Sequence, residues 1–186
     1  MNPARTVRAT AIPSGSVVAM HLPGAQFFDC FETADPFPDT SALQTWLDMV
    51  ARTPGWMRAL MALRNRLVRM VGLKDVGQLH DGTRRTTAGY RVGDQVSFFE
   101  IRHLGEREVV MGANDLHLNV HVSLHKRMQD GQAMLSISSV VHIHNALGHA
   151  YMAVVAPFHR RVVRALLARV DAGAPAAASP QRPPRA

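Results

Sequence analysis

The sequence has very little cysteine: Cys30 is the single one among 186 residues. One thiol cannot form a disulfide within the chain, so a disulfide-stapled secreted scaffold is excluded. The chain also lacks any apolar run near the roughly 20 residues that a membrane-spanning helix needs. Arg5 and Arg8 precede an apolar run, 17–20, that is too short for the core of a signal peptide. We therefore expect a cytoplasmic protein with no membrane span.

Glycine-rich phosphate-binding loops are absent as well. Neither the G-x-G-x-x-G fingerprint nor the P-loop pattern occurs anywhere in the sequence. The nucleophile elbow G-x-S-x-G is also missing, although serine, histidine and aspartate are all present for a triad. We therefore expect no nucleotide cofactor, and motifs alone assign no reaction to the chain.

Acidic residues are outnumbered by basic ones, 14 against 21, which gives a net charge of +7. Such a balance is typical of nucleic-acid binding when the charge gathers on one surface. Here the arginines lie along two expected helices, largely off their apolar stripes, and in the C-terminal tail. No helix-turn-helix, zinc-finger or aromatic RNA-binding signature accompanies them. We therefore expect solvated helix faces and no nucleic-acid partner. The arginines concerned are Arg58, Arg64, Arg66, Arg69, Arg160, Arg161, Arg164, Arg169, Arg182 and Arg185.

Composition divides the chain into three parts. Residues 1–22 are polar and interrupted by proline and glycine, which predicts an irregular segment over the surface. Residues 23–170 hold the apolar periodicity and form one domain, long enough to bury a sizeable core. Residues 171–186 are rich in alanine and proline without an apolar period, which predicts a disordered tail.

The elements of the central domain can be read from local signals. Ser41-x-x-Gln44 resembles a capping box at the start of a helix, and Asp130-Gly131 is a strong signal for a two-residue hairpin turn. Apolar spacing supplies the other boundaries. The expected elements are a strand at 26–33, helices at 41–52 and 54–72, a loop at 74–89, strands at 95–104, 108–111, 116–127 and 133–144, and a long helix at 148–170, kinked at Pro157.

A sheet with helices before and after it is an α+β fold. One arrangement buries every apolar stripe: an antiparallel sheet wrapped around the long C-terminal helix, which is the helix-grip plan. The pair His142-x-His144 suggests a cupin-like barrel as the alternative fold. The long terminal helix and the missing downstream carboxylate argue against that barrel.

Four segments resemble an uncharacterised bacterial family, a domain of unknown function that occurs alone or fused behind NmrA-like NAD(P)-binding domains. The segments are 23–31, 54–73, 114–123 and 145–167. The family is similar to the START/polyketide-cyclase-like (SRPBCC) helix-grip superfamily. The resemblance implies a cavity between sheet and C-terminal helix that binds an apolar or amphipathic small molecule. This chain lacks a Rossmann half, so nicotinamide chemistry does not carry over.

The resemblance also implies ligand-binding residues on the C-terminal helix. Tyr151, Val155 and Phe158 lie on or beside the expected apolar stripe, and His159 adjoins it. Asn145 lies just before the helix and is the fifth candidate. Core packing is the commoner role for such a stripe, and capping the helix is the commoner role for such an asparagine.

Histidines are concentrated in the expected hairpin: five of the ten lie between residues 117 and 144. A two-residue turn at Asp130-Gly131 places His117 opposite His144 and Asn119 opposite His142. His117, His142 and His144 are therefore the candidate ligands of a metal ion such as zinc, iron or copper. His117 and His144 are the candidate catalytic pair for acid–base chemistry near pH 7.

The histidine row alternates with apolar residues, as it does on any half-exposed antiparallel strand. In a helix grip the apolar face turns toward the helix, so the histidines turn toward water or another subunit. We therefore favour a solvated face or a subunit interface over a metal site. Metal-assisted or acid–base catalysis and a homodimer through this face are the two alternatives.

Overall fold

The computed structural model describes residues 6–52, 55–57, 87 and 89–170. Two expected elements, the helix at 54–72 and the loop at 74–89, lie mostly outside these residues, and the expected tail at 171–186 lies wholly outside them. Residues 55–57 of the expected helix are helical.

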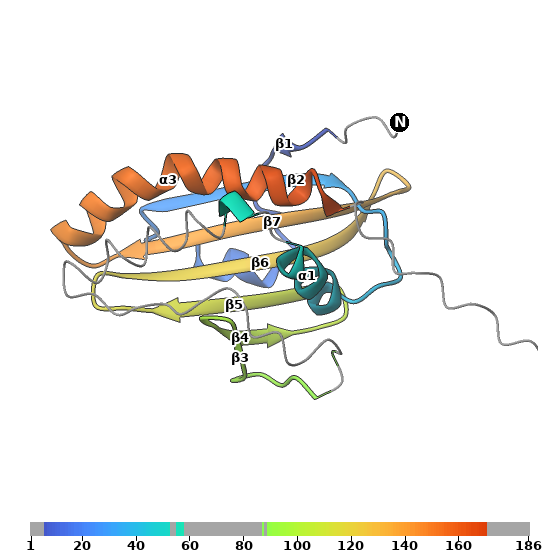
Figure 1. Ribbon diagram of the computed structural model, residues 1–186, viewed down its shortest axis with the longest axis horizontal. Coiled ribbons are helices and arrows are strands. Elements are labelled where there is room, and N and C mark those ends of the chain that lie inside the picture. Colours follow the sequence, from blue (N-terminus) through green and yellow to red (C-terminus); the bar gives the residue numbers. More distant parts are fainter. Residues whose placement is uncertain (1–5, 53–54, 58–86, 88, 171–186) are drawn as a thin grey trace, which may run out of the picture.

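The described residues form one seven-stranded antiparallel sheet with helices on it, an α+β fold (Figure 1). The strand order is β1-β2-β7-β6-β5-β4-β3. Helices α1 and α3 lie on one face of the sheet, and the short 3-10 helix η1 lies on the other. The elements are β1 Arg8–Ala9, η1 Val17–His21, β2 Phe27–Ala34, α1 Ala42–Ala51, β3 Gln95–Val96, β4 Phe99–Leu104, β5 Glu108–Asn114, β6 Leu118–Gln129, β7 Gln132–Ile143 and α3 Ala146–Leu167.

Two elements form where local sequence signals predicted them. The Ser41 hydroxyl accepts a hydrogen bond from the Gln44 backbone N–H at 3.3 Å, which caps α1 as expected. Asp130 and Gly131 both have positive φ, 50° and 77°, as a tight hairpin turn requires. The β6–β7 register that follows pairs Asn119 with His142, which confirms the predicted pairing.

The expected strand at 95–104 is wrong as a single strand. Ser97, with φ of 61°, separates β3 from β4. The β4–β5 register then shifts between Ile101 and His103, which makes Arg102 the extra residue of a β-bulge. Because a bulge breaks the alternation of side chains, Arg102 and His103 come to lie on the same face of the sheet.

Helix α3 buries a different face from the one its apolar stripe predicts. Gly148, Met152 and Val163 are buried, whereas Phe158 is 44% exposed and Val154 is exposed. The buried face is therefore turned by about one residue, or about 100° around the helix axis. Two contacts explain the difference. Gly148 packs directly on the sheet. His159, one residue after Phe158, makes polar contacts with Ser139 and Asp29 of the sheet.

The N-terminal segment covers the second face of the sheet. It was expected to be irregular, but part of it forms the helix η1 and is buried. Val18 in η1 is fully buried between sheet residues. The Glu108 carboxylate accepts hydrogen bonds from the hydroxyls of Ser16 and Ser123, both at 2.6 Å, and from the Val17 N–H at 2.8 Å. Burial alone would raise the pKa of Glu108, but these hydrogen bonds outweigh it and hold the pKa below its usual value. Glu108 therefore fixes η1 on the sheet as an ionised carboxylate.

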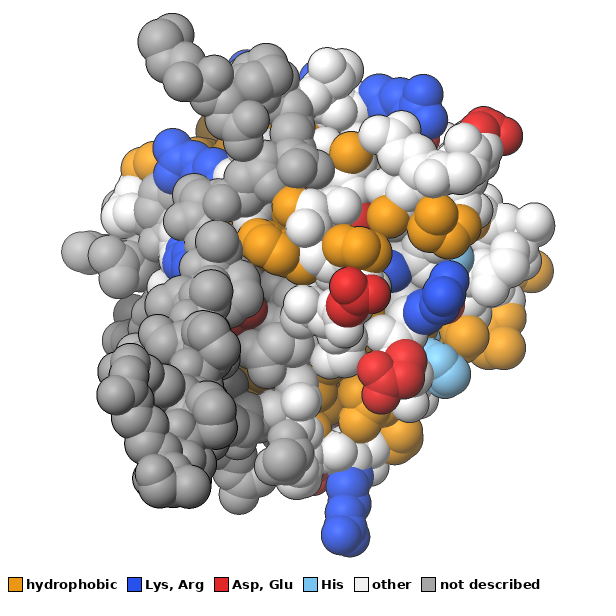
Figure 2. Space-filling model, turned by 90° about the vertical axis from the view of Figure 1, so that its right-hand side faces the viewer, with side chains coloured by type: hydrophobic (Ala, Val, Ile, Leu, Met, Phe, Trp, Pro, Cys, Tyr) orange, Lys and Arg blue, Asp and Glu red, His pale blue; other side chains and the backbone are white. Residues whose placement is uncertain are grey.

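Surface charges are mixed on the face that Figure 2 shows, where basic side chains are scattered among acidic and apolar ones. Among the described residues, no helix is both long enough and apolar enough to span a membrane.

Candidate functional site

The polar contact beneath α3 involves His159, one of the residues predicted from the sequence. Its Nε2 atom lies 3.0 Å from the Ser139 hydroxyl and 3.4 Å from Asp29 Oδ1. Asp29 is 9% exposed, and neither of its carboxylate oxygens has a hydrogen bond among the described residues. A serine–histidine–aspartate triad uses both ring nitrogens, one for each partner. Here one nitrogen faces both, so this arrangement is a packed polar contact and not a triad.

The other predicted α3 residues do not gather around one hollow. Val155 is partly buried, and Tyr151 packs its ring against the edge of His117 at 5.3 Å between centroids. Asn145 caps the helix: its Oδ1 accepts from the Gly148 N–H at 3.0 Å, and its Nδ2 donates to the Leu116 carbonyl at 3.2 Å.

The predicted cluster of His117, His142 and His144 does not form. The backbones of His117 and His144 are linked as expected, by a 3.0 Å hydrogen bond. The His117 ring, however, is 2% exposed and lies against Tyr151, whereas His144 is exposed. The turn before β6, closed by the Asp115 N–H on the Leu118 carbonyl, interrupts the alternation and turns His117 toward α3. Among the described residues, no three histidine, cysteine, aspartate or glutamate side chains are arranged so that they could hold a metal ion.

A different set of histidines meets on the opposite face of the sheet. We expected this face to turn toward water or another subunit, but η1 of the same chain covers its centre. The rings of His21 and His121 stack with centroids 3.7 Å apart, and His142 meets His121 edge-on at 6.5 Å. His142 Nε2 also lies 2.8 Å from the His21 carbonyl oxygen. Sequence reasoning missed His21 because it lies in η1, far from the hairpin along the chain.

The stacked imidazoles of His21 and His121 resist protonation. Burial, followed by the neighbouring His21, His142 and Arg102, lowers the pKa of His121 to about 4, and burial and His142 lower the pKa of His21. A folded-state pKa below the ordinary 6.5 means that the unfolded chain binds more protons between these values. The stabilisation from this stack is therefore complete above about pH 6.5 and is lost as the pH falls toward 4.

We predict that His121→Phe, a ring that cannot be protonated, flattens the pH dependence of folding. The difference in unfolding free energy between pH 7 and pH 4.5, measured by urea denaturation, should be smaller in this variant than in the parent. His149→Phe, at an exposed position on α3, should keep the parent's dependence. Equal pH dependence in parent and His121→Phe would contradict the assignment.

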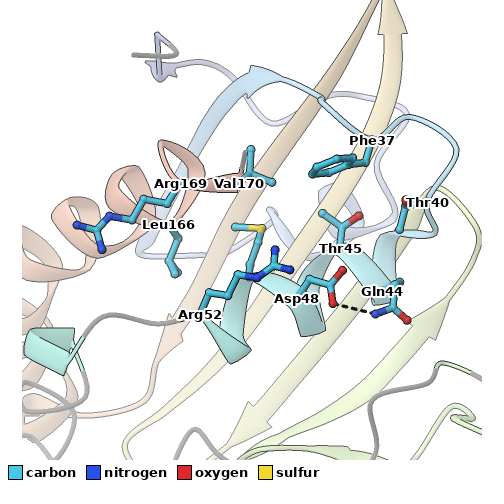
Figure 3. Close-up of a pocket in the computed structure, with 10 residues that line it drawn as sticks. Phe37, Thr40, Gln44, Thr45, Asp48, Arg52, Leu166, Arg169 and Val170 are labelled. Carbon is cyan, nitrogen blue, oxygen red and sulfur yellow. Dashed lines mark hydrogen bonds between the residues drawn. The ribbon is translucent and has the colours of Figure 1, made fainter. Parts of the chain in front are cut away.

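A pocket of about 330 Å³ opens between α1 and the last turns of α3 (Figure 3). We call it the α1–α3 pocket. Its apolar lining consists of Phe37, Met49, Leu166 and Val170. Its polar lining consists of Thr40, Gln44, Thr45, Asp48, Arg52 and Arg169. The arrangement can hold a molecule with an apolar body against the first set and a polar group against the second.

One wall of this pocket is fixed by a buried lysine from β6. The Lys126 ammonium donates to the carbonyls of Phe37 and Thr40 at 2.7 and 2.6 Å and lies 3.2 Å from Asp35 Oδ2. Asp35 Oδ1 in turn accepts from the Phe37 N–H at 3.0 Å. These contacts hold the β2–α1 connection in place. Sequence reasoning missed the pocket because its residues come from three segments with no shared motif.

The comparisons with known proteins identify the family of this chain but assign it no function. The family described as "Protein of unknown function (DUF2867)" matches residues 21–166. No curated protein matches the chain. Among solved structures, the crystal structure of CalU16 from Micromonospora echinospora is 11% identical, covering 90% of this chain and 95% of that one, with a TM-score of 0.25. That likeness is too distant to assign a fold or a ligand. The match over residues 21–166 shows that the chain belongs to the DUF2867 family of proteins of unknown function.

Proposed function

We propose that this chain is a helix-grip domain that binds an amphipathic small molecule in the α1–α3 pocket. One observation carries the proposal: four apolar side chains from three segments surround an open space beside a set of polar side chains. A volume of about 330 Å³ is at the lower end of the range for small-molecule sites, roughly 300–1,000 Å³. The ligand would therefore be small.

The lining supports a division of the ligand into two ends. Met49 and Val170 are buried and Leu166 is partly buried, so they offer an apolar wall that already belongs to the core. Asp48, which accepts a 2.9 Å hydrogen bond from Gln44 Nε2, and the exposed Arg52 stand on the α1 side (Figure 3). A ligand with one apolar and one hydrogen-bonding end fits this arrangement.

The proposal keeps the ligand against the C-terminal helix, as the resemblance implied, but between that helix and α1 instead of between the helix and the sheet. It places the ligand at the last turns of α3 instead of beneath Tyr151, Val155 and Phe158. The physical reason is the rotation of the helix. Phe158 turns toward solvent, and His159 occupies the seam with its contacts to Ser139.

Filling the pocket tests the proposal. The dye 1-anilinonaphthalene-8-sulfonate, which joins apolar rings to a sulfonate, should bind the parent chain at one site with enhanced fluorescence. Leu166→Trp places a bulky ring in the pocket, and the affinity should fall by about tenfold or more, since lost apolar contact of this kind is worth roughly 1.5–3 kcal/mol. The measurement is a fluorescence titration with urea denaturation as a check on folding.

Leu147→Trp is the matched control, because Leu147 is an exposed leucine at the other end of α3. Its dye affinity should equal that of the parent. Equal affinities in Leu166→Trp and Leu147→Trp would show that the dye binds elsewhere and would overturn the proposal.

A further inference from the structure

The η1 face of the sheet carries a second pocket, of about 400 Å³. None of the site residues predicted from the sequence lines it. We call it the η1 pocket. Its polar lining consists of His21, Arg102, His103, Asn114, Asn119 and His121. Side chains of η1 and Val110 supply apolar surface beside them. The α1–α3 pocket lies on the other face, so the two are separate.

The β-bulge builds one side of this pocket. In a regular strand, Arg102 and His103 would point to opposite faces. The register shift places both in the pocket instead. Bulges often re-aim side chains beside functional sites, and this one brings a guanidinium and an imidazole together.

Gly112 in β5 lets the side chains of Arg102 and His121 lie close together over its backbone. It pairs with His121 across the β5–β6 ladder, and a Cβ atom at this position would lie 3.3 Å from Arg102 Cγ and 3.4 Å from His121 Nδ1. Such contacts are tighter than ordinary van der Waals packing. A larger residue would therefore push the two basic side chains away from their present positions, and glycine allows both to stay.

The polar side chains that line the η1 pocket share one chemical character. The ionisable side chains lining the pocket are all bases, and the amides of Asn114 and Asn119 stand on paired residues at the end of the β5–β6 ladder. The acid beside them is Glu100, 3.0 Å from Arg102, and both members of that ion pair are more than one-third exposed. An exposed pair of this kind contributes little free energy, so another oxyanion can replace Glu100 at small cost.

We propose that the η1 pocket binds a small oxyanion, a carboxylate or phosphate group, with Arg102 as its charged partner. The planar guanidinium donates two parallel N–H groups to a pair of oxygens, and the imidazole and amide N–H groups donate to the remainder. The anion faces four basic side chains that line the pocket: Arg102, His103, His21 and His121. His142 contacts the His121 ring edge-on, and Glu100 competes with the anion for Arg102.

Nuclear magnetic resonance of the histidine side chains tests this proposal on the full chain. Inorganic phosphate and benzoate are titrated separately at pH 6, at constant ionic strength set with sodium chloride. The His121 and His21 resonances should shift and saturate with at least one anion. Saturation by phosphate alone or by benzoate alone identifies the class of anion. No saturable shift with either anion overturns the proposal.

Two arginine variants separate site binding from general charge. Arg102→Gln should weaken the anion by about tenfold or more, as expected for the loss of a charge-assisted hydrogen bond. Arg107→Gln removes the same charge from an exposed position between β4 and β5 and should leave the affinity unchanged. Equal effects of the two variants would overturn the proposal. Gly112→Val, which displaces Arg102 and His121 without altering a charge, should abolish the shift, and retained binding would count against the site.

Discussion

Replacing Lys126 with methionine is expected to lower the free energy of unfolding by about 3–5 kcal/mol, the usual cost of breaking a buried ion pair on one side. The side chains of Lys126 and Asp35 are only 5% and 1% exposed. Methionine keeps the aliphatic stem but leaves the Asp35 carboxylate without its cationic partner and the carbonyls of Phe37 and Thr40 without their donor. Urea denaturation with circular dichroism measures the loss.

A second substitution shows that the uncompensated charge causes most of this loss. Asp35→Asn in the Lys126→Met background removes that charge, while the amide oxygen can still accept from the Phe37 N–H. At least half of the lost stability should return, and the double-mutant cycle gives the coupling energy. A single variant within about 1 kcal/mol of the parent, a loss ordinary for any point mutant, would contradict the structural role of this pair.

The substitution Gly148→Ala should destabilise the chain by about 3 kcal/mol, at the upper end of the range for an overpacked site. A Cβ atom on Gly148 would lie 2.2 Å from the His117 carbonyl oxygen and 2.7 Å from Ile143 Cγ2. The same carbonyl accepts the His144 N–H at 3.0 Å, so moving it disrupts the connection between β7 and α3. Thermal and urea denaturation measure the effect.

The sign of this effect is unusual for a helix, where alanine is about 1 kcal/mol better than glycine by intrinsic propensity. Ala150→Gly, at an exposed position two residues further along α3, is the control and should cost about that amount. A Gly148→Ala variant as stable as the parent would mean that α3 does not pack against His117 as described.

Short-range signals made much of the fold predictable. Ser41 and Gln44 define the start of α1 through contacts within one turn, and Asp130-Gly131 defines both the hairpin and its register. In each case the interacting groups are neighbours along the chain. The α+β class, with its antiparallel sheet and C-terminal helix, follows from the same local patterns.

The candidate sites depended on contacts that local patterns do not encode. Adjacent apolar residues, Val154 and Val155, leave the rotation of α3 undetermined, and the contacts of Gly148 and His159 with the sheet decide it. The bulge at Arg102 has no sequence signature. The stack on His121 was unpredictable because its partner, His21, belongs to a segment that appeared irregular.

The pairing of β2 with β7 also determines when the sheet can form as the chain is synthesised. Cys30 Sγ accepts a 3.2 Å hydrogen bond from Ser138 Oγ, although the two residues are 108 positions apart. At roughly 5–20 residues per second, β2 leaves the ribosome about 5 to 20 seconds before its partner does. The β6–β7 hairpin closes over two turn residues, so it can fold first and offer its free edge to β2. The first long strand to emerge is thus one of the last to be incorporated.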